Sequence, residues 1–136
     1  MKNPAHKKKV IGYTGKNSVL SKSFRKKYSS EFIFKKYRKD INNLSAFKKW
    51  INNNKDINIL INFAAITTAI ECDKNKKLAL QTNYSSPKEI LKIINNSKLK
   101  QFSYFLSMST CHVFKKSFKK LNENSKILIV LEILFL

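Results

Sequence analysis

Ile57-Asn58-Ile59-Leu60-Ile61-Asn62-Phe63-Ala64-Ala65 is an apolar run of strand length that ends in an amide and small residues. A run of this kind is typical of a strand that is buried on both faces of a sheet. In open α/β sheets, ligands bind beyond the carboxyl ends of the strands, where small side chains let a ligand approach the backbone. The run therefore predicts a buried strand. Its end is compatible with a ligand site, although buried strands that bind nothing have the same pattern.

Segments with strand and helix patterns alternate on either side of this run. We expect strands at residues 9–14, 31–34 and 102–108, and helices at 21–28, 43–53, 73–82 and from residue 86 onward. Strands that alternate with helices at this spacing form βαβ units, whose crossover connections are right-handed. The sequence thus predicts an α/β fold with a mainly parallel sheet flanked by helices, in a single domain that spans residues 1–136.

Two of these helices have recognisable starts. Asn43 and Ser86 are residue types that cap helices, and Pro87 follows the second cap at the first helical position. Phe47 and Trp50 belong to the apolar face of the earlier helix. We therefore expect these two aromatic side chains in the core rather than on a platform for stacking ligands.

The net charge of +20 would ordinarily suggest nucleic acid or an anionic surface as a partner. The lysines, however, are scattered in pairs along the whole sequence. They occur together with abundant Asn, Ile and Phe, which are the amino acids favoured by A/T-rich coding sequences. We therefore attribute most of the charge to genome composition, and nucleic acid is not the expected partner. Binding of a small phosphate-bearing ligand is compatible with either origin of the charge.

The cysteines and the two termini indicate where in the cell the protein is located. Cys72 and Cys111 are far apart, and neither has the spacing of a zinc site or of a disulfide framework. We expect no metal site and a reducing, cytoplasmic location. The N-terminus lacks the apolar core of a signal peptide, and the apolar tail from Ile127 to Leu136 is too short to cross a bilayer. No membrane association is expected.

Four strand ends, taken in order, carry a family resemblance. They are Thr14-Gly15-x-x-Ser18-x-x-Ser21, the basic cluster at 35–38, Asn62-Phe63-Ala64-Ala65 and Ser109-Thr110. The strongest match runs without a gap from Ile61 through Asp73-Lys74-Asn75 to Asn83. Over about residues 8–125 the sequence resembles the extended short-chain dehydrogenase/reductase (NAD-dependent epimerase/dehydratase) family, and its dTDP-4-dehydrorhamnose reductase branch in particular. The resemblance implies a Rossmann-type parallel sheet that is incomplete at the C-terminal side.

The resemblance also implies a dinucleotide site at the first turn. The family's pattern Gly-x-x-Gly-x-x-Gly corresponds to Gly15, Ser18 and Ser21, so two of its three glycines are serine here. The second glycine lets the backbone approach the pyrophosphate and the third permits close helix–strand packing, so the serines put dinucleotide affinity in question. By the same resemblance, further cofactor-binding residues are Val19, Leu20, Phe63, Ala64, Ala65 and Asn83.

A basic cluster occupies the position at which the family contacts the adenosine ribose of the cofactor. An NAD-preferring fold usually places an acid about 20 positions beyond the first glycine, and this chain has Lys35 there. Lys35, Lys36 and Arg38 would instead neutralise a 2′-phosphate. The sequence therefore favours NADP(H) over NAD(H), although lysines occur nearly everywhere in the chain. Asp40 and Ile41 resemble the family's dipeptide beside the adenine.

Thr110 matches the family's catalytic Ser/Thr, whose hydroxyl hydrogen-bonds the substrate carbonyl while a Tyr delivers a proton and the cofactor a hydride. That Tyr belongs to a Tyr-x-x-x-Lys motif, which is absent from the sequence after Thr110. Tyr84 and Lys88 have the required spacing but precede the Ser-Thr strand end. Thr67 and His112 are expected on the substrate side, with a plain polar loop residue as the alternative for His112.

Residues 126–136 form an apolar tail that does not resemble the corresponding segment of the family. We therefore expect a truncated or frame-shifted part of a longer enzyme, with a small domain whose tail forms a final strand as the alternative. The parent enzyme would reduce a 4-keto nucleotide sugar with NADPH in polysaccharide synthesis, and this fragment would be inactive. A nucleotide-sugar epimerase or dehydratase fragment is one alternative, and a non-catalytic module for a nucleotide or nucleic acid is another. A homodimer is compatible with the resemblance.

Overall fold

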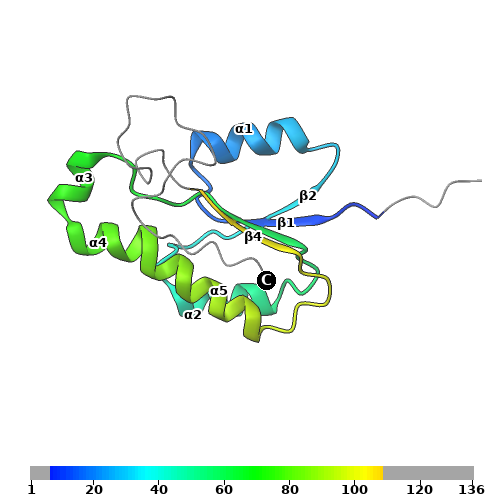
Figure 1. Ribbon diagram of the computed structural model, residues 1–136. Helices are drawn as coiled ribbons and strands as arrows, with labels where there is room; N and C mark the ends of the chain where they lie inside the picture. Colours follow the sequence, from blue (N-terminus) through cyan, green and yellow to red (C-terminus); the bar gives the residue numbers. More distant parts are fainter. Residues whose placement is uncertain (1–6, 109–136) are drawn as a thin grey trace, which may run out of the picture.

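The computed structural model describes residues 7–108, which form an open sheet with helices on both faces (Figure 1). The strands of this part of the chain are β1 (Val10–Tyr13), β2 (Ile33–Lys36), β3 (Ile59–Asn62) and β4 (Tyr104–Ser107). Its helices are α1 (Val19–Tyr28), α2 (Leu44–Asn52), α3 (Ala69–Lys74), α4 (Lys76–Leu80), the π-helical η1 (Gln81–Ser85) and α5 (Ser86–Asn96). None of the helices within residues 7–108 has the length and apolar character needed to cross a membrane.

The four described strands are all parallel, in the order β2-β1-β3-β4. Gly12 of β1 lies opposite Lys35 of β2 on one side and Leu60 of β3 on the other. The chain thus steps outward from β1 to β2, returns across β1, and continues to β3 and β4. The direction reverses between β1 and β3, which is where open α/β sheets bind their ligands. The predicted α/β fold, with a Rossmann-type parallel sheet flanked by helices, is confirmed.

Two apolar layers hold the helices against the sheet. The helix α1 covers one face, and α2 and α5 cover the opposite face (Figure 1). The larger layer, under α2 and α5, includes the fully buried side chains of Phe47, Ile51, Leu60 and Ile90. The smaller layer groups Ile11, Tyr13, Ile61 and Phe63 with Phe24 of α1. Trp50 packs against the larger layer, so the prediction that the α2 aromatics are core residues is confirmed.

The segment between β3 and α5 differs from the single helix predicted at 73–82. Thr68 caps the short helix α3, and Asn75 ends it with φ −144° and ψ 77°. The Asn75 side chain then accepts a hydrogen bond from the Leu78 N–H at 3.0 Å and so caps α4. The prediction was wrong because a capping amide at this position starts a new helix. The π-helical turn η1 joins α4 to α5.

Ser86 does not cap α5, contrary to the prediction, because α5 continues directly from η1. Its buried hydroxyl instead donates to the Asn42 Oδ1 at 2.7 Å. The Asn42 amide also donates to the Thr82 Oγ1 at 3.0 Å, so one side chain ties η1 and α5 to the loop before α2. Asn43 caps α2 as predicted, accepting from the Ala46 N–H at 3.0 Å.

Candidate functional site

Asn62, the last residue of β3, joins the carboxyl ends of three strands. Its side-chain oxygen accepts hydrogen bonds from the Thr14 hydroxyl, after β1, and from the Ala64 N–H at 3.0 Å. Its side-chain N–H donates to the Ser107 Oγ of β4 at 3.1 Å. Asn62 and Thr14 are 2% and 1% exposed, so their polar atoms depend on this network rather than on water. The network fixes the edge of the sheet at the switch point between β1 and β3.

Gly15 turns the chain from β1 towards α1 directly against the backbone that follows β3. Its φ is +65°, in the left-handed region that favours glycine. A Cβ at this position would lie 2.5 Å from the carbonyl carbon of Phe63 and 2.6 Å from the nitrogen of Ala64. The Phe63 side chain is buried and packs against Phe24, so Phe63 offers its backbone to the turn. The predicted strand end thus forms the floor on which the Gly15 turn rests.

The N-terminus of α1 starts beside this turn. Ser18 is the N-cap, and its Oγ accepts a long hydrogen bond of 3.4 Å from the Ser21 N–H. Ser21 is fully buried, and its hydroxyl lies 3.1 Å from the carbonyl oxygens of both Gly15 and Ser18, so the turn itself uses this hydroxyl. Val19 and Leu20 are 78% and 52% exposed. Backbone N–H groups in the first helical turn have no acceptor inside the helix, so they can bind an anion.

Asn83 holds the loop that follows β3. Its side-chain oxygen accepts from the Ile66 N–H at 2.8 Å, and its amide donates to the Ile66 carbonyl at 2.8 Å. Both the oxygen and the amide of the Asn83 side chain, predicted to bind the cofactor, therefore hydrogen-bond to this loop. Ala65 and Thr67 lie in the same loop and line a hollow of about 370 Å³ next to α3 and α4, whose lining includes one acidic residue, Glu71. Thr67 is thus accessible, as its predicted substrate role requires.

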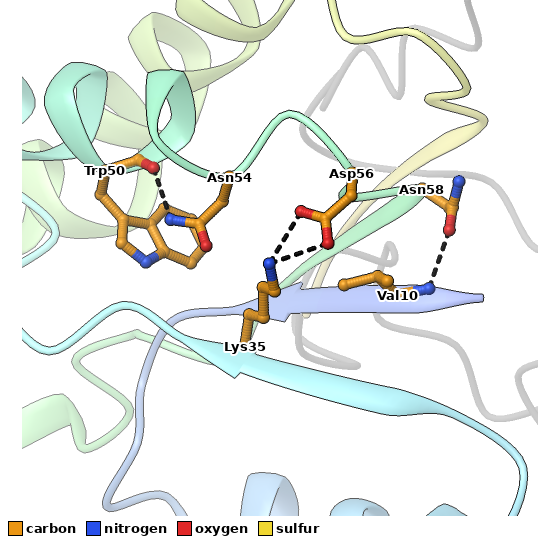
Figure 2. Close-up of polar contacts among 6 residues, drawn as sticks. All are labelled: Val10, Lys35, Trp50, Asn54, Asp56 and Asn58. Carbon is orange, nitrogen blue, oxygen red and sulfur yellow. Dashed lines mark hydrogen bonds and ion pairs between the residues drawn. The ribbon is translucent and has the colours of Figure 1, made fainter. Parts of the chain in front are cut away.

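Lys35, predicted to neutralise a 2′-phosphate, is engaged elsewhere. Its ammonium lies 2.8 Å from both carboxylate oxygens of Asp56, in the segment before β3 (Figure 2). Successive side chains of a strand face opposite sides of the sheet, and Lys35 faces the α2 side, with Trp50 and Asn54. The pKa of Asp56 is lowered from its usual value, mainly because its carboxylate accepts a hydrogen bond from Lys35.

We expect Lys35→Met to lower the free energy of unfolding by only about 0–1 kcal/mol at neutral pH, because both partners are partly exposed. A depressed carboxyl pKa contributes stability above its unfolded-state value and loses that contribution as the pH falls through the folded-state value. The difference between Lys35→Met and the unchanged chain should therefore shrink on acidification. Urea unfolding at neutral and acidic pH measures it, with Lys26→Met as a control for charge. A difference that grows in acid would contradict this account.

A second hollow, of about 440 Å³, lies at the carboxyl end of β2. Lys36 and Arg38 both line it, so these two members of the predicted basic cluster come together there. Asp40 accepts a hydrogen bond from the Asn42 N–H at 2.7 Å and shapes the loop before α2. Ile41 is 5% exposed and belongs to the larger apolar layer, so its side chain is part of the core.

The predicted catalytic and substrate residues Thr110 and His112 lie outside the described residues, as does the apolar tail at 126–136. Their roles stay predictions. Tyr84 and Lys88, which have the spacing of the missing motif, lie on η1 and α5. The Lys88 ammonium is 5.8 Å from the centroid of the Tyr84 ring.

Two features of the site were not predicted. The first is the hydrogen-bond network of Asn62, whose sequence signal is a polar residue at the end of each of three apolar strands: Thr14, Asn62 and Ser107. The second is Arg25, which reaches the hollow at the end of β2 from α1. Arg25 has no distinctive signal, because Lys26 and Lys27 follow it on the same helix.

No protein-family model and no curated protein matches the chain. Solved structures do match it. A dTDP-4-dehydrorhamnose reductase from Clostridium acetobutylicum is 26% identical, with a TM-score of 0.68, over 85% of this chain and 44% of that chain. The dTDP-4-dehydrorhamnose reductase of Bacillus anthracis, solved with NADP, is 21% identical, with a TM-score of 0.63, over 74% and 36%. MoeE5, solved with UDP-glucose and NAD, is 11% identical, with a TM-score of 0.70, over 86% and 42%.

The chain spans less than half the length of each of these proteins, because the matches cover 36–44% of their chains. Nucleotide-sugar enzymes are thus the structural neighbours of this fold. The chain has the Rossmann-type fold of the extended short-chain dehydrogenase/reductases, and its predicted resemblance to this family, with dTDP-4-dehydrorhamnose reductases among its neighbours, is confirmed.

Proposed function

We propose that the chain is the NAD(P)-binding part of a nucleotide-sugar reductase similar to the dTDP-4-dehydrorhamnose reductases. The Gly15 turn carries this proposal, because a left-handed glycine rests on the Phe63–Ala64 backbone where the strand order reverses. Such a turn lets a pyrophosphate approach backbone N–H groups at a helix N-terminus. Two similar structures were solved with NADP or NAD, which supports a nicotinamide dinucleotide as the ligand.

The residues at the turn fit the pyrophosphate of such a ligand. A Cβ at Gly15 would clash with the backbone that follows β3, so the glycine lets the turn lie close to the sheet. Val19 and Leu20 would offer backbone N–H groups from the first turn of α1. Ser18, at the family's second glycine, uses its oxygen as a helix cap and keeps its hydroxyl proton to donate to a phosphate. The serine changes are therefore compatible with binding.

Lys36 and Arg38 support NADP(H) over NAD(H) in this proposal. Both line the hollow at the carboxyl end of β2, where a Rossmann fold holds the adenosine ribose. Within residues 7–108, neither side chain forms an ion pair. Cationic side chains at this place pair with a 2′-phosphate, whereas an NAD-preferring site has a carboxylate for the ribose hydroxyls.

The proposed parent reaction is reduction of a 4-keto nucleotide sugar, for which the dinucleotide supplies the hydride. Thr110 would hydrogen-bond the substrate carbonyl, and Thr67 and His112 would contact the sugar. The family's proton donor, a Tyr-x-x-x-Lys motif, does not occur after Thr110. Since general acid catalysis alone contributes roughly 10²–10⁴-fold, we propose that the 136-residue chain is catalytically inactive or nearly so. Epimerase or dehydratase chemistry is the second candidate, because the motifs retained here do not fix the reaction.

Titration of the full chain with NADPH and NADH, followed by dinucleotide fluorescence, tests the proposal. We expect saturable binding of NADPH and no robust reduction of a 4-keto nucleotide sugar. A chain that binds neither dinucleotide would contradict the proposed binding function. Robust carbonyl reduction by the purified chain would contradict its proposed inactivity and leave the binding function intact.

The net charge of +20 favours one rival function, a nucleic-acid-binding module. Titration of DNA at two salt concentrations separates the two, because neutralised phosphates make nucleic-acid binding steeply dependent on salt. Tight, salt-dependent DNA binding without any NADPH signal would support the rival. NADPH binding with weak DNA binding would support the nucleotide site.

A further inference from the structure

The hollow at the carboxyl end of β2 combines aromatic walls with cationic side chains. It measures about 440 Å³ and is lined by Tyr13, Arg25, Phe34, Lys35, Lys36, Arg38, Trp50 and Asn54. Four of these residues are cationic and none is acidic. Within residues 7–108, β2 pairs only with β1, so the hollow lies beside a free strand edge. An anion carried on an aromatic group has the matching chemistry.

The four cations of this hollow are not equivalent. Lys35 is bound to both oxygens of Asp56 at 2.8 Å, so its charge is already compensated (Figure 2). The other ion pair in residues 7–108 joins Lys92 to Glu89, which leaves Arg25, Lys36 and Arg38 without a carboxylate in this part of the chain. Three uncompensated cations therefore face one hollow.

Arg25 packs against an aromatic ring and has no carboxylate partner among residues 7–108. It lies in the last turn of α1, and helical side chains lean towards the helix N-terminus, which carries its guanidinium back over the end of β1. The guanidinium carbon lies 5.0 Å from the centroid of the Tyr13 ring. Its Nε is buried and has no hydrogen-bond partner within the described structure. Buried donors of this kind are rare. An anion in the hollow would be bound by the terminal N–H groups of the guanidinium, because the Nε itself has almost no accessible surface.

We propose that Arg25, rather than Lys35, completes the phosphate-binding end of this hollow with Lys36 and Arg38. Its ligand would be the 2′-phosphate of NADP(H), so the inference rests on the proposed function and assigns its specificity to a residue of α1. A guanidinium presents several N–H donors in a fixed plane and binds phosphate in a bidentate manner. The Tyr13 ring orients this plane from one side. Lys35 holds β2 to the segment before β3 and contributes no contact to the phosphate.

Arg25→Met tests the proposal in the full chain, with NADPH and NADH titrated in parallel. We expect the Kd for NADPH to rise about tenfold or more, with the Kd for NADH changed less than about twofold. Lys26→Met is the matched control, because it removes the same charge from the next residue of α1 and does not line the hollow. Lys35→Met should behave like this control, and Arg25→Lys should keep part of the NADPH preference. Circular dichroism checks that each variant folds.

Three outcomes would overturn the assignment. A parallel loss of NADPH and NADH affinity in Arg25→Met would show a structural role, and an unchanged NADPH affinity would show no role. If Lys35→Met loses its preference for NADPH and Arg25→Met does not, the role belongs to Lys35.

Titration with adenosine 2′-monophosphate separates this proposal from the proposed dinucleotide-binding function. If the chain binds this probe through Arg25 but does not bind NADPH, the phosphate-binding role of Arg25 is supported and the proposed dinucleotide-binding function is contradicted. If the chain binds neither ligand, both proposals are contradicted.

Discussion

Gly15→Ala is expected to lower the free energy of unfolding by about 2–5 kcal/mol and to abolish dinucleotide binding. The backbone φ of +65° is strained for alanine, and the added Cβ would lie 2.5 Å from the Phe63 carbonyl carbon and 2.7 Å from the Phe63 oxygen. Backbone atoms cannot swing aside, and the neighbouring Ala64 N–H is held by Asn62 at 3.0 Å. The turn must therefore lift off the strand that supports it. Urea unfolding and NADPH titration measure the two effects.

Gly12→Ala is the matched control for this prediction. A Cβ at Gly12 would meet the Ile57 Cδ1 at 2.8 Å and the Trp50 ring at 3.0 Å, which are the ends of side chains rather than backbone. These groups can shift within the core at a cost of roughly 1–3 kcal/mol, and the Gly15 turn stays in place. Gly12→Ala should thus lose stability and keep NADPH affinity. Equal NADPH affinity in Gly15→Ala and the unchanged chain would sink the prediction.

Asn62→Leu is expected to lower the free energy of unfolding by about 2–4 kcal/mol, although leucine has a similar size. The substitution leaves the buried Thr14 hydroxyl and the Ala64 N–H without their acceptor, and the Ser107 hydroxyl without its donor. Each buried group left unpaired costs about 1–3 kcal/mol, and the exposed Ser107 recovers its bond from water. Chemical denaturation of the full chain measures the loss.

Asn58→Leu provides the comparison, because Asn58, just before β3, also hydrogen-bonds to β1 and to the segment that precedes β4. Its oxygen accepts from the Val10 N–H at 2.8 Å (Figure 2), and its amide donates to the Gln101 carbonyl at 3.1 Å. Asn58 is only half-buried, so water replaces its bonds in part and the expected cost is about 1 kcal/mol. If the two substitutions cost the same, burial is not the source of the Asn62 effect.

The sequence predicted the sheet because its signals are local. A strand buried on both faces leaves an apolar run, and β3 lies inside the Ile57–Ala65 run. Gly15 was found from its spacing after β1, and its positive φ supplies the physical reason for glycine there. Asn43 was recognised as a cap because capping is a local interaction: its side chain accepts a hydrogen bond from the N–H of Ala46, three residues later.

The role of Lys35 was out of reach of the sequence because it depends on where the second strand ends. The predicted strand ended at residue 34, which would place Lys35 in the loop at the carboxyl edge. The observed β2 runs from Ile33 to Lys36 and places Lys35 within the strand, on the side that faces α2. A side chain within a strand must face one side of the sheet, whereas a side chain in the loop beyond the strand has no such constraint. Its partner Asp56 is 21 residues away, so no local pattern reports the pair.

The contact between the Gly15 turn and the end of β3 also orders events during folding. Thr14 and Asn62, which lie on either side of this contact, are separated by 48 residues. Contacts between such distant residues form slowly, because a long segment must lose its conformational freedom first. The helix α1 can form as soon as its own residues have been synthesised, but the Gly15 turn has no backbone to pack against until β3 is in place. The capacity to hold a dinucleotide should therefore be absent from the first βα unit alone and should not appear before the chain has been synthesised past residue 64.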